Sequence, residues 1–309
     1  MRIAAIDIGT NTILMLIANV ENGTILDIIR DEHTIARIGE GVDSQRNISP
    51  DALKRLRICL KEYVRIARSL DVDRIVACGT SALRDAGNAK EIVQHVRTSF
   101  DLEITILSKE DEATMTYVGA LSGLTRLDDI STHTVIDIGG GSTEIAFGKR
   151  TSIESHASLD VGSVRLTERF LQKYPPTSQS MHTATAFIQD LLRSAPSIPS
   201  DSHFIGVAGT LTTLSSLYLG IRTYEGRRIE GFRLTTKMVE GSFERLRDLS
   251  LEEIVAIPQI PPQRADIILA GVLILRELLN HYEQDSITVS NRGLRFGILL
   301  REAAIAKRN

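Results

Sequence analysis

The sequence has few cysteines, no long apolar run and no excess of positive charge. The two cysteines, Cys59 and Cys78, have neither a metal-ligand spacing nor the pattern of a disulfide framework. The longest apolar stretch, residues 267–275, is far shorter than the about 20 residues that span a bilayer, so it predicts a buried helix. The first residues lead directly into a predicted strand rather than a signal-peptide core. We therefore expect a cytoplasmic protein with no membrane segment.

The formal net charge is −3, because 36 basic residues face 39 acidic ones. A protein that mainly binds nucleic acid usually has a clear basic excess, so this class is disfavoured. A polyanionic substrate is not excluded, since it needs only local cations that the total charge does not reveal. With 42% hydrophobic and 24% charged residues, the 309-residue chain has the composition of a globular protein and the length of two domains.

One short segment occurs twice, 130 residues apart. Residues 6–12 read IDIGTNT and residues 136–142 read IDIGGGS, and each copy joins two apolar strands. A turn of glycine and small hydroxyl residues exposes backbone N–H groups to one point, and glycine lets an anion approach closely. The repeat therefore predicts two domains of similar topology with one phosphate-binding loop each, formed by Gly9, Thr10, Asn11 and Thr12 and by Gly139, Gly140, Gly141 and Ser142.

Predicted strands alternate with predicted helices along the rest of the chain, which indicates an α/β fold with a largely parallel sheet in each half. Ser49-Pro50-Asp51 is typical of a helix start, and apolar residues then recur at helical spacing from residue 53 to residue 67. Residues 262–282 predict one long helix. A polar stretch at 123–131 predicts the boundary between an N-terminal domain, 1–125, and a C-terminal domain, 126–296. We expect the last helix, about 297–309, to pack back on the N-terminal domain.

Acidic residues accompany both loops. Asp7 and Asp137 interrupt apolar strands just before the turns, where a carboxylate either accepts hydrogen bonds from its own turn or holds Mg²⁺ beside phosphates. Glu144 lies in the strand that leaves the second loop. It either faces solvent or orients a metal-bound or attacking water.

Two further segments carry charge. Glu110, Asp111 and Glu112 open a predicted helix, and the helix dipole alone accounts for acids at that position. Arg84 follows a buried strand and a Gly-Thr turn, so it is either a surface residue or a cation near the phosphates.

Two strand–glycine junctions are of the kind that receives anions at a helix N-terminus. The first is residues 206–210, with Gly209 and Thr210, and the second is residues 290–293. Four arginines are either substrate contacts or surface cations: Arg165, Arg264, Arg292 and Arg295.

Taken together, these segments resemble the actin/Hsp70/sugar-kinase superfamily and, within it, the exopolyphosphatase/guanosine pentaphosphatase family. The resemblance extends from residue 1 to about 302. Its most specific motifs are DIGTNT at 7–12, TSALRDA at 80–86, SKEDEA at 108–113, DIGGGSTE at 137–144 and the segment 158–168.

The resemblance implies two actin-like (ribonuclease H-like) domains, each a mixed five-stranded sheet flanked by helices, with a cleft between them. It implies that Glu112 is the general base that activates water. Asp137, with Asp7, is then expected to hold Mg²⁺ or another divalent cation, and Glu144 to position the metal or the water. Arg84, the two loops and the Gly209–Thr210 junction are expected to bind the terminal phosphates.

The expected activity is the release of terminal phosphate from inorganic polyphosphate or from guanosine pentaphosphate, by a homodimer. The alternatives are an ATP-dependent sugar or acid kinase of the same superfamily and a non-catalytic alarmone-binding protein. Phe296 stands where the family commonly has glutamate, which argues against a carboxylate role there. The chain also lacks the C-terminal helical extension of longer members, so we expect weaker processivity on long chains.

Overall fold

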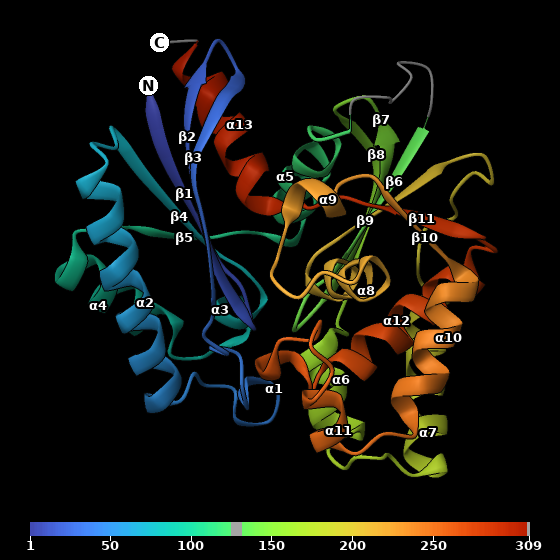
Figure 1. Cartoon of the computed structure of the whole chain (residues 1–309). Coiled ribbons are helices and arrows are strands. Elements are labelled where there is room, and N and C mark those ends of the chain that lie inside the picture. Colours follow the sequence, from blue (N-terminus) through green and yellow to red (C-terminus); the bar gives the residue numbers. More distant parts are fainter. Residues whose placement is uncertain (125–131, 308–309) are drawn as a thin grey trace. The chain divides into compact units, whose positions relative to one another are not determined.

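The computed structural model describes residues 1–124 and 132–307. The chain divides into two compact units (Figure 1), one comprising Met1–Gly119 with Leu294–Asn309 and the other Ala120–Gly293. The domain boundary predicted at residues 125 and 126 lies outside the described residues. No helix in the described part of the chain is long and apolar enough to cross a membrane.

The first unit contains a five-stranded mixed sheet. Its order is β3-β2-β1-β4-β5, with β1 antiparallel to β2 and parallel to β4. Because β1 has a neighbour on each side and both its faces are covered, residues 3–6 and Ile8 are apolar and buried. The strands are β1 (Arg2–Ile8), β2 (Thr12–Glu21), β3 (Thr24–Ile35), β4 (Arg74–Gly79) and β5 (Ile104–Ile106).

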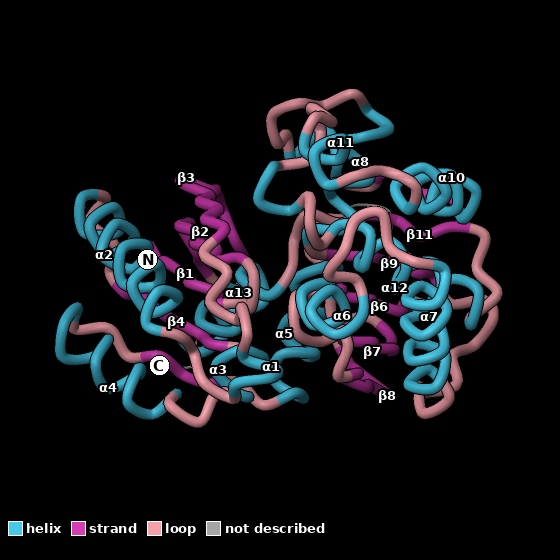
Figure 2. Tube along the Cα trace, turned by 90° about the horizontal axis from the view of Figure 1, so that it is seen from below, coloured by secondary structure: helices cyan, strands magenta, loops and turns pink. Residues whose placement is uncertain are grey.

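Helices cover the two faces of this sheet. Side chains alternate along β1, so that Ala4, Ile6 and Ile8 pack toward α2 and α4, which lie side by side (Figure 2), and Ile3 and Ala5 pack toward α13. The predicted start of α2 is confirmed, because the Ser49 side chain accepts a hydrogen bond from the amide of Ala52. The helices are α1 (Val42–Gln45), α2 (Pro50–Ser69), α3 (Ser81–Asp85), α4 (Ala89–Phe100), α5 (Lys109–Leu121) and α13 (Leu294–Ala306).

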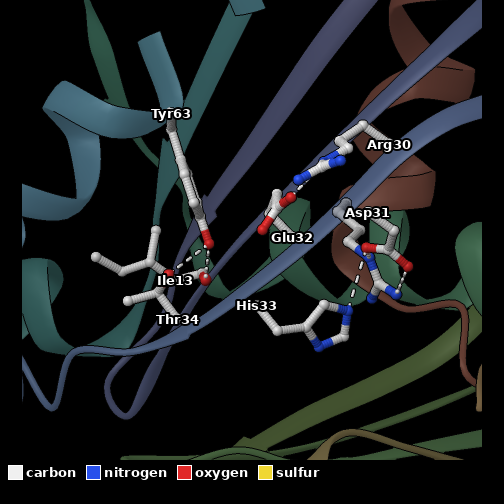
Figure 3. A network of polar contacts seen from close by, with 8 residues as sticks. Ile13, Arg30, Asp31, Glu32, His33, Thr34 and Tyr63 are labelled. Carbon is white, nitrogen blue, oxygen red and sulfur yellow. Dashed lines mark hydrogen bonds and ion pairs between the residues drawn. The ribbon is translucent and has the colours of Figure 1, made fainter. Parts of the chain in front are cut away.

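The final helix, α13, is fixed to the first unit by a polar and an apolar contact. The guanidinium of Arg295 is 4% exposed and donates two hydrogen bonds of 3.0 Å to the carboxylate of Asp31 on β3. His33 makes a further 3.2 Å hydrogen bond with the same carboxylate (Figure 3). Phe296 is 2% exposed and lies in an apolar cluster with Met115, so this position contributes to the core. Arg295, a candidate substrate contact in the sequence, is instead a buried structural cation.

A second polar contact lies on the other side of β2. The hydroxyl of Tyr63 on α2 donates to the carbonyl oxygen of Ile13 at 3.0 Å and lies 2.9 Å from the Thr34 hydroxyl (Figure 3). A buried tyrosine hydroxyl needs such partners, because leaving it unsatisfied costs free energy. These bonds hold α2 against β2 and β3.

The second unit contains a mixed sheet of six strands in the order β10-β11-β9-β6-β7-β8. The prediction of five strands was correct for the first unit and wrong here, because β10 adds an antiparallel edge strand to β11. Without β10, the order and directions match those of the first sheet, as the sequence repeat predicted. The strands are β6 (Thr132–Ile138), β7 (Thr143–Lys149), β8 (Ser152–Leu159), β9 (His203–Val207), β10 (Phe232–Thr235) and β11 (Ser286–Val289).

The main core of the second unit lies between this sheet and helices α6, α7 and α12. Ile136, Ile138 and Ile145 on the strands pack with apolar residues of these helices. The helices are α6 (Ser163–Phe170), α7 (Ser178–Leu192), α8 (Gly209–Leu219), α9 (Gly226–Ile229), α10 (Thr236–Arg247), α11 (Leu251–Val255) and α12 (Ile268–His281).

The single long helix predicted over residues 262–282 is wrong. A 3-10 turn at Pro262–Arg264 precedes α12, which begins at Ile268. The carbonyl oxygen of Asp266 accepts a 2.7 Å hydrogen bond from the Tyr174 hydroxyl, so a side-chain donor takes an acceptor that would otherwise belong to the helix.

We predict that Gly297→Ala destabilises the protein, although alanine normally favours a helix over glycine by about 1 kcal/mol. A Cβ at residue 297 would lie 1.9 Å from the carbonyl oxygen of Met115. Relieving this overlap should lower the free energy of unfolding by about 1–3 kcal/mol, measured by urea denaturation. Gly293→Ala is the control, since a Cβ there has no neighbour within 4 Å. Equal stability of the two variants would contradict the close helix crossing.

We also predict an acid-sensitive contribution from Asp31. Burial raises the pKa of this carboxyl, but the bond from His33 and the charge of Arg295 outweigh burial and lower the pKa to about 2. Its stabilisation is therefore present above the ordinary value of 3.8 and lost as pH falls toward 2. Asp31→Asn should cost at least about 1 kcal/mol of unfolding free energy at pH 7, and the difference from wild type should vanish in acid. Asp27→Asn is the control, an exposed acid on the same strand whose variant should keep the wild-type stability at pH 7.

Candidate functional site

The first predicted phosphate loop joins β1 to β2. The amide of Gly9 donates to the carbonyl oxygen of Thr12 at 3.1 Å and closes the turn. A Cβ at residue 9 would lie 2.9 Å from that oxygen, so the turn requires glycine. Thr10 and Asn11 form the tip, and both are buried.

The segment after β3 supports this tip. The amides of Ala36 and Arg37 donate to the carbonyl oxygen of Asn11, and the amide of Gly39 donates to that of Thr10 at 2.9 Å. A Cβ at residue 39 would lie 2.2 Å from the methyl carbon of Thr10. Residues 36–39 thus bond the carbonyls of the tip and leave its amides to other partners.

The second loop repeats the first. The amide of Gly139 donates to the carbonyl oxygen of Ser142 at 3.0 Å, and a Cβ at residue 139 would lie 3.0 Å from the same oxygen. Here the support is the start of α6, where the amide of Val164 donates to the carbonyl oxygen of Gly140 at 2.9 Å. Gly162 is required because its Cβ would lie 2.5 Å from that carbonyl group.

Both tips present backbone donors. Among the described residues, no backbone carbonyl accepts from the amides of Thr10, Asn11, Gly140 or Gly141. Consecutive amides of this kind make a concave site for anionic oxygens. The geometry of each loop therefore fits a phosphate group.

The second loop also carries a pair of carboxylates. Asp137 on β6 lies directly opposite Glu144 on β7, and side chains opposite one another in an antiparallel pair point to the same face. Glu144 is buried, and the Ser158 hydroxyl donates to its Oε1 at 3.0 Å. At the first loop Asp7 lies opposite Leu14. Of the two loops, the second is therefore the one with a facing pair of carboxylates.

This pair fits a divalent cation. Two like charges directly opposite repel, and a cation held by both would offset the repulsion. Magnesium is typically bound by one or two carboxylates together with water and substrate phosphates. In the parts of the chain that the structure describes, no three His, Cys, Asp or Glu side chains gather into a metal site. The facing carboxylates of Asp137 and Glu144 therefore fit a divalent cation.

Arg84 and Glu112 form an ion pair in the first unit. Nη1 of Arg84 lies 2.7 Å from Oε2 of Glu112 and also donates to the carbonyl oxygen of Leu107 at 3.0 Å. The Glu112 residue is 7% exposed. The sequence predicted both residues in the site without predicting that they bind one another.

Local structure brings this pair together. The Thr80 amide bonds to the end of β1, and α3 then carries Arg84. The Leu107 amide bonds to Gly79 at the end of β4, and the Ser108 hydroxyl accepts from the amide of Asp111 in the first turn of α5. The ends of neighbouring strands thus place α3 and the start of α5 side by side.

Glu112 has the electrostatics of a base. Burial raises the pKa of its carboxyl, while the Arg84 charge and hydrogen bond and the Lys109 charge lower it and Asp85 raises it again, with a net increase. A carboxylate with a raised pKa accepts a proton more readily near neutral pH. The interpretation of Glu112 as an acid that only complements the helix dipole leaves this burial unexplained.

The Gly209–Thr210 junction begins α8 and has a strained backbone. Ala208 has a φ of 74° and a ψ of −175°, a backbone conformation that residues other than glycine rarely adopt. A Cβ at Gly209 would lie 1.7 Å from Nη1 of Arg264, so glycine admits this guanidinium. The Thr210 side chain packs against Gly271 on α12, which leaves its backbone amide as the group available to a ligand.

The second junction, residues 290–293, binds a carboxylate of the protein itself. Glu230 accepts from the Ser290 hydroxyl at 2.9 Å and from the amide of Asn291 at 2.7 Å. Arg292 donates to the carbonyl oxygen of Ser122 at 3.0 Å. The Glu230 carboxylate, an acceptor within the protein itself, accounts for the anion-binding pattern that the sequence shows at residues 290–293.

A sequence model of the Ppx/GppA phosphatase family matches residues 16–305. The chain belongs to this family. It is 32% identical over 314 aligned residues to Exopolyphosphatase 2 of Mycobacterium tuberculosis, covering 97% of this chain and 98% of that protein.

Solved structures agree with the assignment to the Ppx/GppA family. The Aquifex aeolicus family member is 30% identical and superposes with a TM-score of 0.83 over 100% of this chain and 99% of that one. An exopolyphosphatase from Cytophaga hutchinsonii has a TM-score of 0.88 at 23% identity over 98% of each chain, which supports the fold. The predicted family and its two-domain α/β fold are confirmed.

Several residues that shape the site were not predicted. Gly39 and Gly162 support the loop tips, and Ser158 and Leu107 hold Glu144 and Arg84. Gly39 stands alone in the sequence, whereas Gly162 and Ser158 lie in the segment 158–168, which carries part of the family resemblance without indicating what these residues contact. Only the fixed offset of the repeat gave a signal for the loops themselves.

We predict that Arg84→Gln raises the pKa of Glu112 further, because the arginine charge and hydrogen bond oppose the effect of burial. Lys109→Gln should raise it less, since the Lys109 charge is a smaller influence. The pKa can be measured by titrating the carboxyl carbon signals of ¹³C-labelled glutamate in NMR, with Glu112→Gln identifying the signal. An unchanged Glu112 pKa in Arg84→Gln would contradict the ion pair.

Proposed function

We propose that this Ppx/GppA family member is an exopolyphosphatase, which releases terminal orthophosphate from inorganic polyphosphate by water attack. The observation that carries the proposal is the buried Glu112 paired with Arg84, together with two loops whose amides fit phosphate oxygens. The full-length similarity to Exopolyphosphatase 2 supports the same substrate. The cleft that this reaction requires stays a prediction.

In this proposal the reaction depends on positioning and charge rather than on a covalent intermediate. Backbone amides of Thr10, Asn11, Gly140 and Gly141 bind oxygens of the terminal phosphates. Asp137 and Glu144, with Asp7, would hold Mg²⁺, which would supply positive charge against the phosphate oxygens. Glu112 takes a proton from the attacking water, and its burial supports this role because it raises the pKa.

Arg84 is proposed to serve two partners. In the structure its guanidinium bonds to Glu112, and a terminal phosphate would be a competing acceptor for the same donors. When phosphate takes Arg84, Glu112 loses its hydrogen-bonded cation and becomes a stronger base. The Gly209–Thr210 junction is proposed to bind phosphate as well.

Guanosine pentaphosphate is the second candidate substrate, since it also ends in a phosphoanhydride. Membership of a phosphatase family favours hydrolysis over the kinase alternative. We also propose Mg²⁺ as the cation. A homodimer is proposed because symmetric dimers are the commonest oligomers. A cytoplasmic location is proposed because the two buried cysteines are free.

Phosphate release from the purified protein with Mg²⁺ tests the function, comparing long polyphosphate, guanosine pentaphosphate and ATP. We expect polyphosphate to react fastest. Glu112→Gln should lower kcat by at least about a hundredfold, because it removes the base while keeping the shape. Glu110→Gln is the matched control, an exposed acid in the same helical turn. Wild-type activity in Glu112→Gln would refute the assignment of the base, and transfer from ATP to a sugar would establish a kinase.

A further inference from the structure

Helix α2 carries a row of exposed cations. The helix has 20 residues, of which six are basic and two are acidic. Five of the basic residues are exposed and recur every three or four positions, which places them on one side of the helix: Lys54, Arg57, Lys61, Arg65 and Arg68. We call these five residues the α2 row. At about 1.5 Å per residue, the row extends over about 20 Å.

The row is unfavourable for the helix itself. Arg57 and Lys61, and Lys61 and Arg65, are like charges four residues apart, a spacing that destabilises a helix. Arg65 pairs with Glu62, but in the described residues no carboxylate lies within ion-pair distance of Lys54, Arg57 or Lys61.

Elsewhere in the described residues, some arginines have an acidic partner three residues away, as in Arg247 with Glu244 and Arg228 with Glu225. In the α2 row, Arg65 is the member with such a partner in the described residues. The row is therefore a concentration of positive charge on a protein whose net charge is −3.

The N-terminal end of the row is tied to the first phosphate loop. Arg55, next to Lys54, donates to the carbonyl oxygens of Ala36 at 2.6 Å and Arg37 at 2.9 Å. The amides of the same two residues bond to Asn11 at the loop tip. The first turns of α2 are thus held against the segment that supports the loop, and the row leads away from there along the helix.

We propose that the α2 row binds the distal part of a polyphosphate chain whose terminal phosphates lie at the first loop. The proposal rests on the proposed function and deepens it by assigning a site for chain length. A line of cations spaced one helical turn apart complements a flexible chain with one negative charge per unit. Such a row binds through charge alone, so its contribution should weaken as salt rises.

This site separates long substrates from short ones. Tripolyphosphate can occupy the loops without reaching far along α2, whereas a long chain can occupy both. The row should therefore lower KM for long chains and leave kcat unchanged, because it touches no reacting group.

The test is the triple variant Lys54→Gln, Arg57→Gln and Lys61→Gln. Its control is Lys237→Gln, Arg245→Gln and Arg247→Gln on α10, which removes the same number of exposed cations from another helix. We expect KM for long-chain polyphosphate to rise about tenfold in the α2 variant, if each cation contributes as an exposed ion pair does. Its salt dependence should become shallower, and kinetics with tripolyphosphate should match wild type. The α10 control should resemble wild type on both substrates.

Equilibrium binding of fluorescently labelled long-chain polyphosphate, in the absence of Mg²⁺, separates this site from the proposed activity. Absence of phosphate release by the wild type would refute the proposed function, whereas weaker binding by the α2 variant alone would still support the row as a polyphosphate site. Unchanged binding by the α2 variant, or an equal loss with the α10 control, would overturn the proposal. Loss of single-stranded RNA binding with polyphosphate binding intact would overturn it in favour of a nucleic-acid partner.

Discussion

The turns after β1 and β6 depend on one constraint, the absence of a side chain at the residue that closes each turn. The amides of Gly9 and Gly139 each donate to the carbonyl oxygen three residues later, and a Cβ would lie only 2.9 Å and 3.0 Å from that oxygen. The hydrogen bond that closes each turn does not involve the carbonyl groups at its tip, so carbonyls there accept from other segments. Residues 36–39 support one tip and the start of α6 supports the other, each through a further glycine contact. The same local geometry is therefore held by two unrelated neighbours.

The two units share a topology and differ in the charge that they place beside the loops. The second has two carboxylates opposite one another, Asp137 and Glu144, whereas the first has Leu14 at the place of Glu144. The first instead supplies Glu112, whose partner is the cation Arg84. A carboxylate bound to a metal ion is a poor proton acceptor. In the proposed mechanism Glu112 is the base and the pair of Asp137 and Glu144 holds the metal, so the two roles fall on different carboxylates.

Local patterns predicted the elements and non-local contacts decided the rest. The repeat identified both loops and the shared topology, since it depends on residues adjacent in sequence. The Arg84–Glu112 pair joins residues 28 positions apart, and no spacing rule indicates it. At the break before α12, the carbonyl oxygen of Asp266 accepts a hydrogen bond from the Tyr174 hydroxyl, 92 positions away in the sequence. Likewise, β10 is recognisable as a strand only once β11 offers it an edge.

The α2 row is a local concentration of positive charge that the net charge of −3 does not reveal. The apolar residues that predict α2 also fix which side of the helix is buried, as Leu56, Leu60 and Val64 are in the structure. Once that side is fixed, the direction of every other side chain follows from the helical period. Cations spaced by three and four residues are then aligned on the exposed side. The packing that forms the helix is thus also what turns separate basic residues into one continuous surface.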